Sequence, residues 1–84
     1  MTYAEIIVMR IESLRNKRRL SVNQLAEMSG IRQSTLNNII HGQSQNPKLK
    51  TIHRIATAFS MTPAEFLDFK ELNEFSFEDD SEQK

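Results

Sequence analysis

Residues 21–42 read SVNQLAEMSGIRQSTLNNIIHG, and two short helix patterns meet within this stretch. Ser21 is followed three residues later by Gln24, which is the spacing of a capping box at a helix start. Gly30 follows the first pattern and can end that helix in a left-handed conformation. Ile31 and Leu36 form a hydrophobic staple, so a second helix is expected to begin near Arg32 or Gln33 after this turn. The stretch therefore predicts two short helices joined by a tight turn, the sequence form of a helix-turn-helix.

The motifs in and after this stretch resemble those of a known family. They are Gln-Leu-Ala at 24–26, Gly30, Ser-Thr-Leu at 34–36, Gly42, and Asn46-Pro47 with Leu49. Residues from about 7 to 67 are similar to the Xre-type helix-turn-helix domains of phage Cro and lambda repressors and of many small bacterial regulators. The resemblance implies an all-α, compact five-helix lambda-repressor-like domain that binds double-stranded DNA.

The composition fits a small single domain without covalent support. The chain has 84 residues and no cysteine, so neither disulfides nor a thiolate-bound metal supplement its core. A chain this short buries only about 60% of the surface that its unfolded form exposes, so its helices must pack efficiently. No apolar run reaches the about 18 residues that a membrane span needs, and the N-terminus lacks the layout of a signal peptide. We expect a cytoplasmic protein with no membrane partner.

Charge is unevenly distributed along the chain, although its formal net charge is zero. Residues 1–70 contain ten Lys or Arg and five Asp or Glu, whereas residues 71–84 contain one Lys and six acids. This asymmetry indicates a basic helix-turn-helix domain, residues 1–72, followed by an acidic C-terminal tail, residues 73–84. We expect the tail to be disordered and to offer an acidic contact to a protein partner.

Periodic apolar residues predict five helices, at residues 4–17, 22–28, 33–41, 49–59 and from 63 to about 72. The last of them has the clearest start, because Thr62 and Glu65 form a capping box around Pro63. The pattern also places Met28 and Leu49 in the core. The fifth helix carries more apolar surface than a small core needs, which, together with spare apolar residues of the first helix, predicts a homodimer contact.

The exposed side of the third helix carries amides and hydroxyls instead of charges. Asn and Gln can pair bidentately with N6 and N7 of adenine in the major groove, and Ser tolerates several bases. The front of this helix also matches the positions that contact base edges in the repressors that the chain resembles. The predicted base-contacting residues are Gln33, Ser34, Asn37 and Asn38.

Polar and cationic residues around this helix are predicted to contact phosphates. The loop after Gly42 and the start of the fourth helix offer side chains and free N–H groups to a DNA backbone, and the resemblance implies the same region. The predicted phosphate-contacting residues are Asn23, Arg32, Thr35, His41, Gln43, Asn46, Lys48 and Lys50.

Two positions depart from the family that the chain resembles. Val22 stands at the first residue of the second helix, where the family has a glutamine that contacts a phosphate. Ile40 stands where the family places a glutamate, the partner of an arginine that matches Arg15. We therefore expect Arg15 to take another partner or to face solvent or phosphate.

The sequence offers no cofactor site and no catalytic constellation. His41 and His53 are twelve residues apart, with no carboxylate or thiolate at ligand spacing around them, so no metal site is predicted. There is no paired-carboxylate motif and no nucleophile beside a base, and both glycines of the chain punctuate helices instead of cradling a phosphate. We predict that the chain is not an enzyme.

These features predict a sequence-specific DNA-binding regulator of transcription. Two copies would read a palindromic operator whose half-sites lie about one helical turn apart. The resemblance makes repression the expected sign. Two alternatives remain at this point: an antitoxin that binds its own promoter and a toxin, and a protein-interaction module that has lost DNA binding.

Overall fold

The computed structural model describes residues 1–43 and 46–76, and within them it contains helices and no strand. The helices are α1 (Tyr3–Lys17), α2 (Val22–Ser29), α3 (Gln33–Ile40), α4 (Leu49–Ala58), α5 (Pro63–Leu67) and α6 (Lys70–Asn73). The prediction of an all-α fold is confirmed. The predicted acidic tail begins at the last residue of α6, and most of it, residues 77–84, lies outside the described residues together with the disorder expected of it.

Three helices begin with capping boxes. At the start of α2, Ser21 Oγ accepts from the Gln24 N–H at 3.0 Å, and Gln24 Oε1 accepts from the Ser21 N–H at 2.8 Å. The box predicted at the start of α5 forms in the same way. A third box, Thr2 with Glu5, begins α1. Its T-x-x-E signal stands in the sequence but was not among the predicted helix starts.

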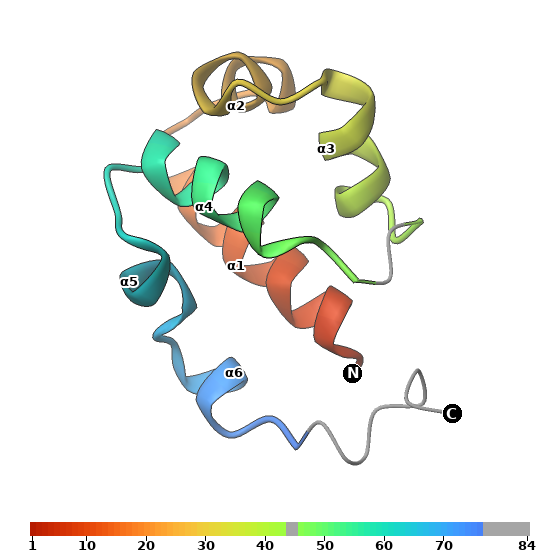
Figure 1. The fold of residues 1–84 in the computed structure, drawn as a ribbon, viewed down its shortest axis with the longest axis vertical. Coiled ribbons are helices and arrows are strands. Elements are labelled where there is room, and N and C mark those ends of the chain that lie inside the picture. Colours follow the sequence, from red (N-terminus) through yellow and green to blue (C-terminus); the bar gives the residue numbers. More distant parts are fainter. Residues whose placement is uncertain (44–45, 77–84) are drawn as a thin grey trace.

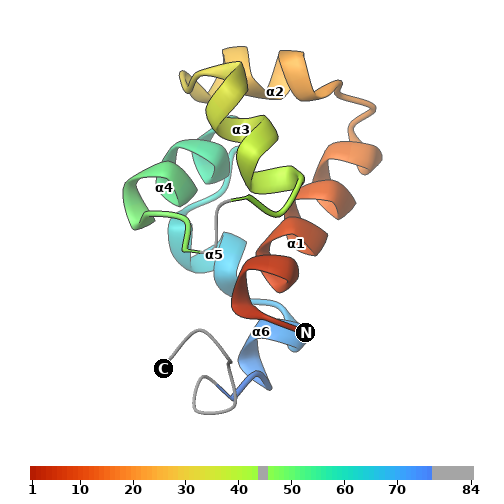
Figure 2. The same cartoon turned by 90° about the vertical axis from the view of Figure 1, so that its right-hand side faces the viewer.

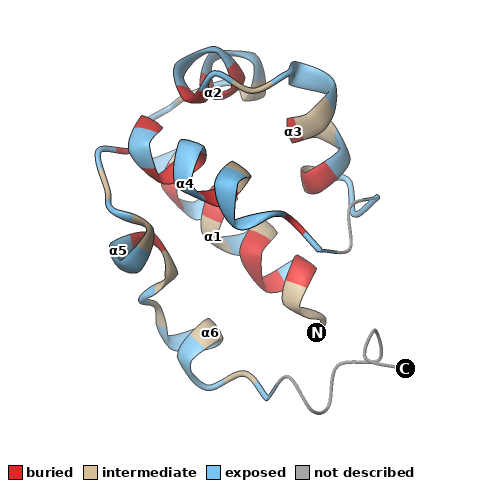
Figure 3. Ribbon diagram, viewed as in Figure 1, coloured by how far each residue is buried: buried red, intermediate tan, exposed pale blue. Residues whose placement is uncertain are grey.

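The helices are stacked along one long axis. In Figure 1, α2 lies across one end of the molecule, α6 lies at the other end, and α1 runs between them behind α4. Figure 2 shows α3 facing the viewer after the turn from α2. Buried residues lie on the sides of α1, α2, α3 and α4 that face one another (Figure 3). The core they form contains Ile7, Ile11, Leu14, Leu25, Ala26, Leu36, Ile39, Ile52, Ile55, Ala56, Ala58, Phe59 and Phe66.

Helices α1 to α4 all end with the same backbone motif. The N–H of the residue with positive φ returns to the carbonyl three residues back, and the next N–H returns to the carbonyl five residues back. This residue is a glycine twice, Gly30 (φ 70°) after α2 and Gly42 (φ 79°) after α3. After α1 and α4 it is Arg19 (φ 54°) and Ser60 (φ 61°). The predicted role of Gly30 as a left-handed helix end is confirmed.

The predicted fifth helix is divided into α5 and α6, and Arg10 gives the reason. Its Nε donates to the carbonyl of Phe66 at 2.8 Å and its Nη2 to the carbonyl of Glu65 at 3.1 Å. In a continuous helix these carbonyls would accept the N–H groups of residues 70 and 69. Phe69 instead adopts an extended conformation, and its ring lies under the Arg10 guanidinium at 5.0 Å. Apolar spacing alone could not predict this contact.

Two residues expected in the core are exposed. Leu49 is 65% exposed and Met28 is 52% exposed, so their placement in the core was wrong. The buried residues nearby are Pro47 before α4 and Ser29 at the end of α2. Ser29 is accommodated because its hydroxyl donates to the carbonyl of Leu25 at 2.6 Å. Helical spacing identifies the apolar side of a helix, but the first or last turn can extend beyond the core.

The apolar surface that suggested a homodimer is mostly covered within the chain. Phe66 is fully buried, while Leu67 and Leu72 pack against the core cluster. In α1, Ile6 is buried and Met9 remains 40% exposed. The homodimer stays a prediction, but the surplus on α5 and α6 from which it was inferred is used inside the chain.

None of the helices within residues 1–43 and 46–76 is long and apolar enough to span a bilayer.

Candidate nucleic-acid interface

The outer face of α3 is set by two buried residues on its inner face. Leu36 and Ile39 are buried in the core cluster, which fixes the rotation of the helix. Three of the four predicted base-contacting residues, Gln33, Ser34 and Asn38, are consequently exposed, and the fourth, Asn37, is half-buried. All four therefore reach the surface, and they follow one another along the first two turns of α3.

The polar groups on this face are not used within the chain. None of these four side chains has a hydrogen-bond partner within residues 1–43 and 46–76. Other polar side chains do have such partners, including the Thr57 hydroxyl, which donates to the carbonyl of His53 at 2.9 Å. The side-chain amides on this face of α3 are thus free to form hydrogen bonds with donors and acceptors of another molecule.

One groove brings together predicted residues from α3 and from the segment before α4. It has a volume of about 290 Å³. The predicted base contact Asn38 lies beside the predicted phosphate contacts Thr35, Asn46 and Lys48. The groove is also lined by Ile39, Pro47 and Thr51. Residues separated by up to 16 positions in sequence therefore line one groove.

The other predicted phosphate contacts do not line this groove. Asn23 is exposed on the first turn of α2, Arg32 precedes α3, and Gln43 follows α3. Lys50 is exposed on α4 and lines a different groove, described below. His41 lines a third hollow.

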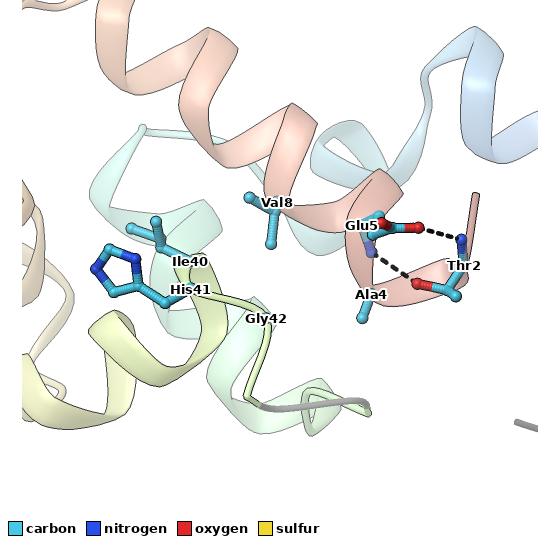
Figure 4. A pocket seen from close by; sticks show the side chains of 7 residues that line it. All are labelled: Thr2, Ala4, Glu5, Val8, Ile40, His41 and Gly42. Carbon is cyan, nitrogen blue, oxygen red and sulfur yellow. Dashed lines mark hydrogen bonds between the residues drawn. The ribbon is translucent and has the colours of Figure 1, made fainter.

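This hollow lies between the start of α1 and the end of α3 and has a volume of about 410 Å³. Val8 of α1 and Ile40 of α3 lie on its two sides, and the hydrogen bonds between Thr2 and Glu5 close one edge (Figure 4). Ile40 thus faces the apolar side chain of Val8 at the position where the family that the chain resembles has a glutamate. Arg15, which matches the arginine that pairs with that glutamate, must therefore take another partner.

Arg15 takes a different partner, Glu12 of the same helix. Its Nε and Nη2 donate to the two carboxylate oxygens of Glu12 at 2.8 and 2.6 Å, and its Nη1 donates to the carbonyl of Leu20 at 2.8 Å. The hydrogen bond from Arg15 lowers the pKa of Glu12 below its ordinary value of 4.5, against an opposing effect of burial, and His41 adds a smaller lowering. Of the alternatives that the sequence left open, the structure therefore selects pairing within the chain.

Two further arginines of this region are also committed to the fold. Arg10 binds the carbonyls at the end of α5, as described above, and Arg18 donates to the carbonyl of Phe59 at 2.8 Å at the end of α4. The guanidinium of Arg18 also lies 5.5 Å from the centre of the Phe59 ring. These cations stabilise the negative ends of other helices and are not displayed like those near α3.

The starts of α3 and α4 differ from those of the three capped helices. Their N-cap residues are Arg32 and Lys48, and neither makes a side-chain cap hydrogen bond. Among the described residues, the first N–H groups of both helices therefore have no intrahelical or side-chain partner, and a cation stands beside each set. Free N–H groups at the positive end of a helix dipole form a suitable anion site. The sequence signal for this arrangement is the absence of Ser, Thr, Asp or Asn at these two N-cap positions.

No cluster of three or more His, Asp or Glu side chains that could hold a metal ion occurs in the described part of the chain.

Comparison with known sequences connects this geometry to a family. The family model described as Cro/C1-type HTH DNA-binding domain matches residues 10–71. The uncharacterised HTH-type transcriptional regulator RghRB of Bacillus subtilis (strain 168) is 39% identical over 51 residues. That match covers 61% of this chain and 37% of RghRB, so the chain spans little more than a third of this curated relative.

Solved structures share the fold. The prophage Lp1 protein 11 is 28% identical, with a TM-score of 0.79 over 89% of this chain and 99% of that protein. An HTH_3 family transcriptional regulator from Vibrio cholerae is 26% identical, with a TM-score of 0.69 over 77% of this chain and 36% of the regulator. A SinR protein/SinI protein complex matches at a TM-score of 0.68 over 86% of this chain and 69% of the matched chain, with 24% identity, and this similarity concerns the fold alone.

The family model spans about three quarters of the chain and includes both helices of the helix-turn-helix. The chain belongs to the Cro/C1-type HTH DNA-binding domain family.

Proposed function

We propose that this chain binds double-stranded DNA in a sequence-specific manner, with α3 in the major groove, and thereby regulates transcription. The observation that carries the proposal is the outer face of α3. Its amides and hydroxyl are at the surface and make no hydrogen bond to the described residues of the chain. A helix that needed only solubility would more usually display Glu and Lys, whereas Gln and Asn match the adenine edge in the major groove.

The helix-turn-helix geometry supports separate proposed roles for α2 and α3. The N-terminal residues of a recognition helix contact base edges, while the preceding helix crosses the DNA backbone. Gln33 and Ser34 stand at the start of α3 and are the foremost candidates for base contact, with Asn37 and Asn38 one turn further on. Asn23 lies on the first turn of α2, where the backbone would pass.

The cations and the free helix starts support phosphate binding on both sides of α3. Arg32 and Lys48 each combine a positive charge with the uncapped N–H groups of the helix that follows. Thr35 and Asn46 share the groove with Lys48. Such contacts fix the position of the domain on the duplex without reading its sequence, so the two residue sets are proposed to have separate roles.

The regulatory part of the proposal is supported by relatives. RghRB and the protein from Vibrio cholerae are both described as transcriptional regulators. We propose that two copies of this chain bind a palindromic operator with half-sites about one helical turn apart, and that binding represses transcription.

The proposal is tested by selecting binding sites for the full chain from random duplex DNA. A selected sequence is then titrated against a scrambled duplex of equal length at two salt concentrations. We expect enrichment of a palindrome and at least a thousandfold preference over the scrambled duplex, the lower end of typical specific binding. Enrichment of a single half-site would remove the dimer from the proposal. No enrichment and no salt-dependent affinity would contradict DNA binding altogether and would favour a protein-interaction module.

A further inference from the structure

A groove between α2 and α4 lies apart from the proposed reading face of α3. It has a volume of about 430 Å³. Its lining residues come from the end of α2 and from one continuous stripe of α4 with the spacing i, i+3, i+4, i+7. They are Met28, Ser29, Lys50, His53, Arg54 and Thr57. We refer to it as the α2/α4 groove.

The α2/α4 groove is basic, and its charges are not paired within the chain. Lys50, His53 and Arg54 are exposed and no Asp or Glu is among the lining residues. Neither Lys50 nor Arg54 makes an ion pair or side-chain hydrogen bond to the described residues. This contrasts with Arg10, Arg15 and Arg18, whose guanidinium groups bind carbonyl or carboxylate oxygens of the fold.

The groove also presents an apolar side chain. Met28, which sequence spacing had placed in the core, is 52% exposed on one wall. An exposed methionine is a flexible and polarizable contact for apolar groups, and a phosphate gains nothing from it. The occupant that fits is therefore acidic and also carries an apolar or aromatic side chain, which favours a protein segment over a DNA backbone.

The chain itself contains a segment with this chemistry. Residues 77–82 read FEDDSE, a phenylalanine followed by five residues of which four are acidic. The segment lies outside the described residues, and it follows directly after Ser76, the last of them. The charge of the segment is opposite to that of the groove, and no other stretch of the chain is as acidic.

The position of α6 indicates that the segment belongs to another copy. α6 and α2 lie at opposite ends of the molecule (Figures 1 and 2), whose longest extent is 34 Å. Asp80 is four residues beyond Ser76, so even a fully extended chain carries it only about 14 Å. Phe77, directly after Ser76, reaches less far still, so a segment of a neighbouring molecule is favoured over the molecule's own as the partner of Met28 on α2.

We propose that the α2/α4 groove binds residues 77–82 of a second copy of this chain. Phe77 contacts Met28, and the acids that follow pair with His53 and Arg54. The interaction is electrostatic at an exposed surface, so it weakens as salt screens the charges. It does not depend on DNA.

The test uses paramagnetic broadening between two full-length samples. The chain has no cysteine, so Gln83→Cys, just beyond the proposed segment, gives one attachment point for a nitroxide label. One sample, at natural isotope abundance, carries the nitroxide. It is mixed with ¹⁵N-labelled chain that carries no nitroxide, so any broadening of the ¹⁵N-labelled amides arises between molecules. We expect loss of amide signal at Met28, His53, Arg54 and Thr57, and recovery of the signal at high salt.

Charge reversal supplies the matched controls. Arg54→Glu in the ¹⁵N sample should abolish the broadening, and Lys17→Glu, the same charge change on an exposed residue of α1, should leave it intact. Pairing Arg54→Glu with a nitroxide sample carrying Asp79→Lys and Asp80→Lys should restore it.

Two results would overturn the proposal. One is broadening of the groove only when isotope and nitroxide are in the same molecule, which would mean that the tail binds its own chain. The other is an absence of broadening while a duplex of random sequence shifts the amides of His53, Arg54 and Thr57, which would make the groove a phosphate surface.

Discussion

Gln33 begins α3 and Lys48 directly precedes α4, and we propose different roles for the two side chains. Gln33→Ala should relax the preference at one base pair by about 1 to 3 kcal/mol, the value of one bidentate base contact. Lys48→Ala should weaken binding to every sequence alike and reduce the salt dependence. The measurement is affinity for the selected operator, for single-base variants of it and for a scrambled duplex. Equal and uniform losses from both substitutions would refute the division of roles.

Glu12 predicts a pH dependence of stability. Arg15 lowers the pKa of Glu12 in the folded chain below its ordinary value of 4.5, so the unfolded chain binds the proton more readily. The stabilisation is therefore complete well above pH 4.5 and is lost as the pH falls through the lower, folded value. Glu12→Gln should reduce the free energy of unfolding by under about 1 kcal/mol at neutral pH, because the pair is partly exposed. The variant and the parent should converge as the pH falls below the folded pKa of Glu12.

Glu27→Gln is the control for this experiment, because Glu27 is exposed on α2 and has no partner within the described residues. Urea unfolding at several pH values should show the convergence for Glu12→Gln, while the Glu27→Gln curve stays parallel to that of the parent. A constant difference between the Glu12→Gln variant and the parent across this range would show that the ion pair does not contribute as described.

Single residues differ in how far the sequence predicts them. The exposure of Gln33, Ser34 and Asn38 follows from the spacing of Leu36 and Ile39, and the structure agrees. The partner of Arg15 could not be chosen from sequence, because Glu12 and solvent were both within reach. The contacts of α3 with bases and phosphates stay predictions.

At the scale of helices, α1 to α4 end in the same backbone motif, but the residue that adopts positive φ is a glycine in only two of the four. A left-handed backbone costs a residue with a side chain roughly 1 to 2 kcal/mol and glycine almost nothing. Ser60 adopts this conformation after α4, and its side chain is exposed. Ser60→Gly should therefore raise the free energy of unfolding by up to about 1 kcal/mol, since the added flexibility of the unfolded chain offsets part of the gain.

Gly30→Ala is the converse change at the equivalent position after α2. Nothing lies within 4 Å of a Cβ added there, so the effect comes from the backbone alone. We expect a loss of roughly 1 kcal/mol. Thermal unfolding of both variants and of the parent measures the two changes in the free energy of unfolding. A destabilised Ser60→Gly variant together with an unaffected Gly30→Ala variant would contradict the account of these helix ends.

Helix starts were easier to predict than helix continuity. Ser21 with Gln24 is a local signal, complete within four residues, and its box forms as predicted. The division between α5 and α6 depends on Arg10, whose carbonyl partners lie more than fifty residues away in sequence. A pattern read along one segment cannot include a donor from another.

For the whole molecule, the number of free cations determines how salt should affect binding. Only three of the proposed phosphate contacts, Arg32, Lys48 and Lys50, carry a permanent positive charge, and the others are polar or histidine. A plot of the logarithm of the association constant against the logarithm of the salt concentration should have a slope of about −3 for one subunit. For two subunits on one operator the slope should be about −5 to −6. Affinity measured between 50 and 200 mM salt gives this slope. A value twice as steep would show that further cations contact the DNA.

The basic character of residues 1–70 overstates the charge that is available to DNA. Composition predicts a basic body, but it cannot show that Arg10, Arg15 and Arg18 bind oxygens of the chain itself. Three-dimensional structure is needed to separate cations that hold helices together from cations that face outward.

The uncapped starts of α3 and α4 should make the first turns of these helices less rigid in the free protein than in a DNA complex. First turns without a capping partner fray more readily than those of α1, α2 and α5, so their amide hydrogens should exchange with solvent quickly in the free protein. A duplex that supplies phosphate oxygens to these N–H groups would complete the two turns. Hydrogen exchange of the amides of Ser34, Thr35 and Lys50 should then slow on operator binding, while that of the Gln24 amide, already held by Ser21, should not change. In this sense the DNA would supply the missing cap, and the proposed base-contacting helix α3 would be among the last parts of the domain to become rigid.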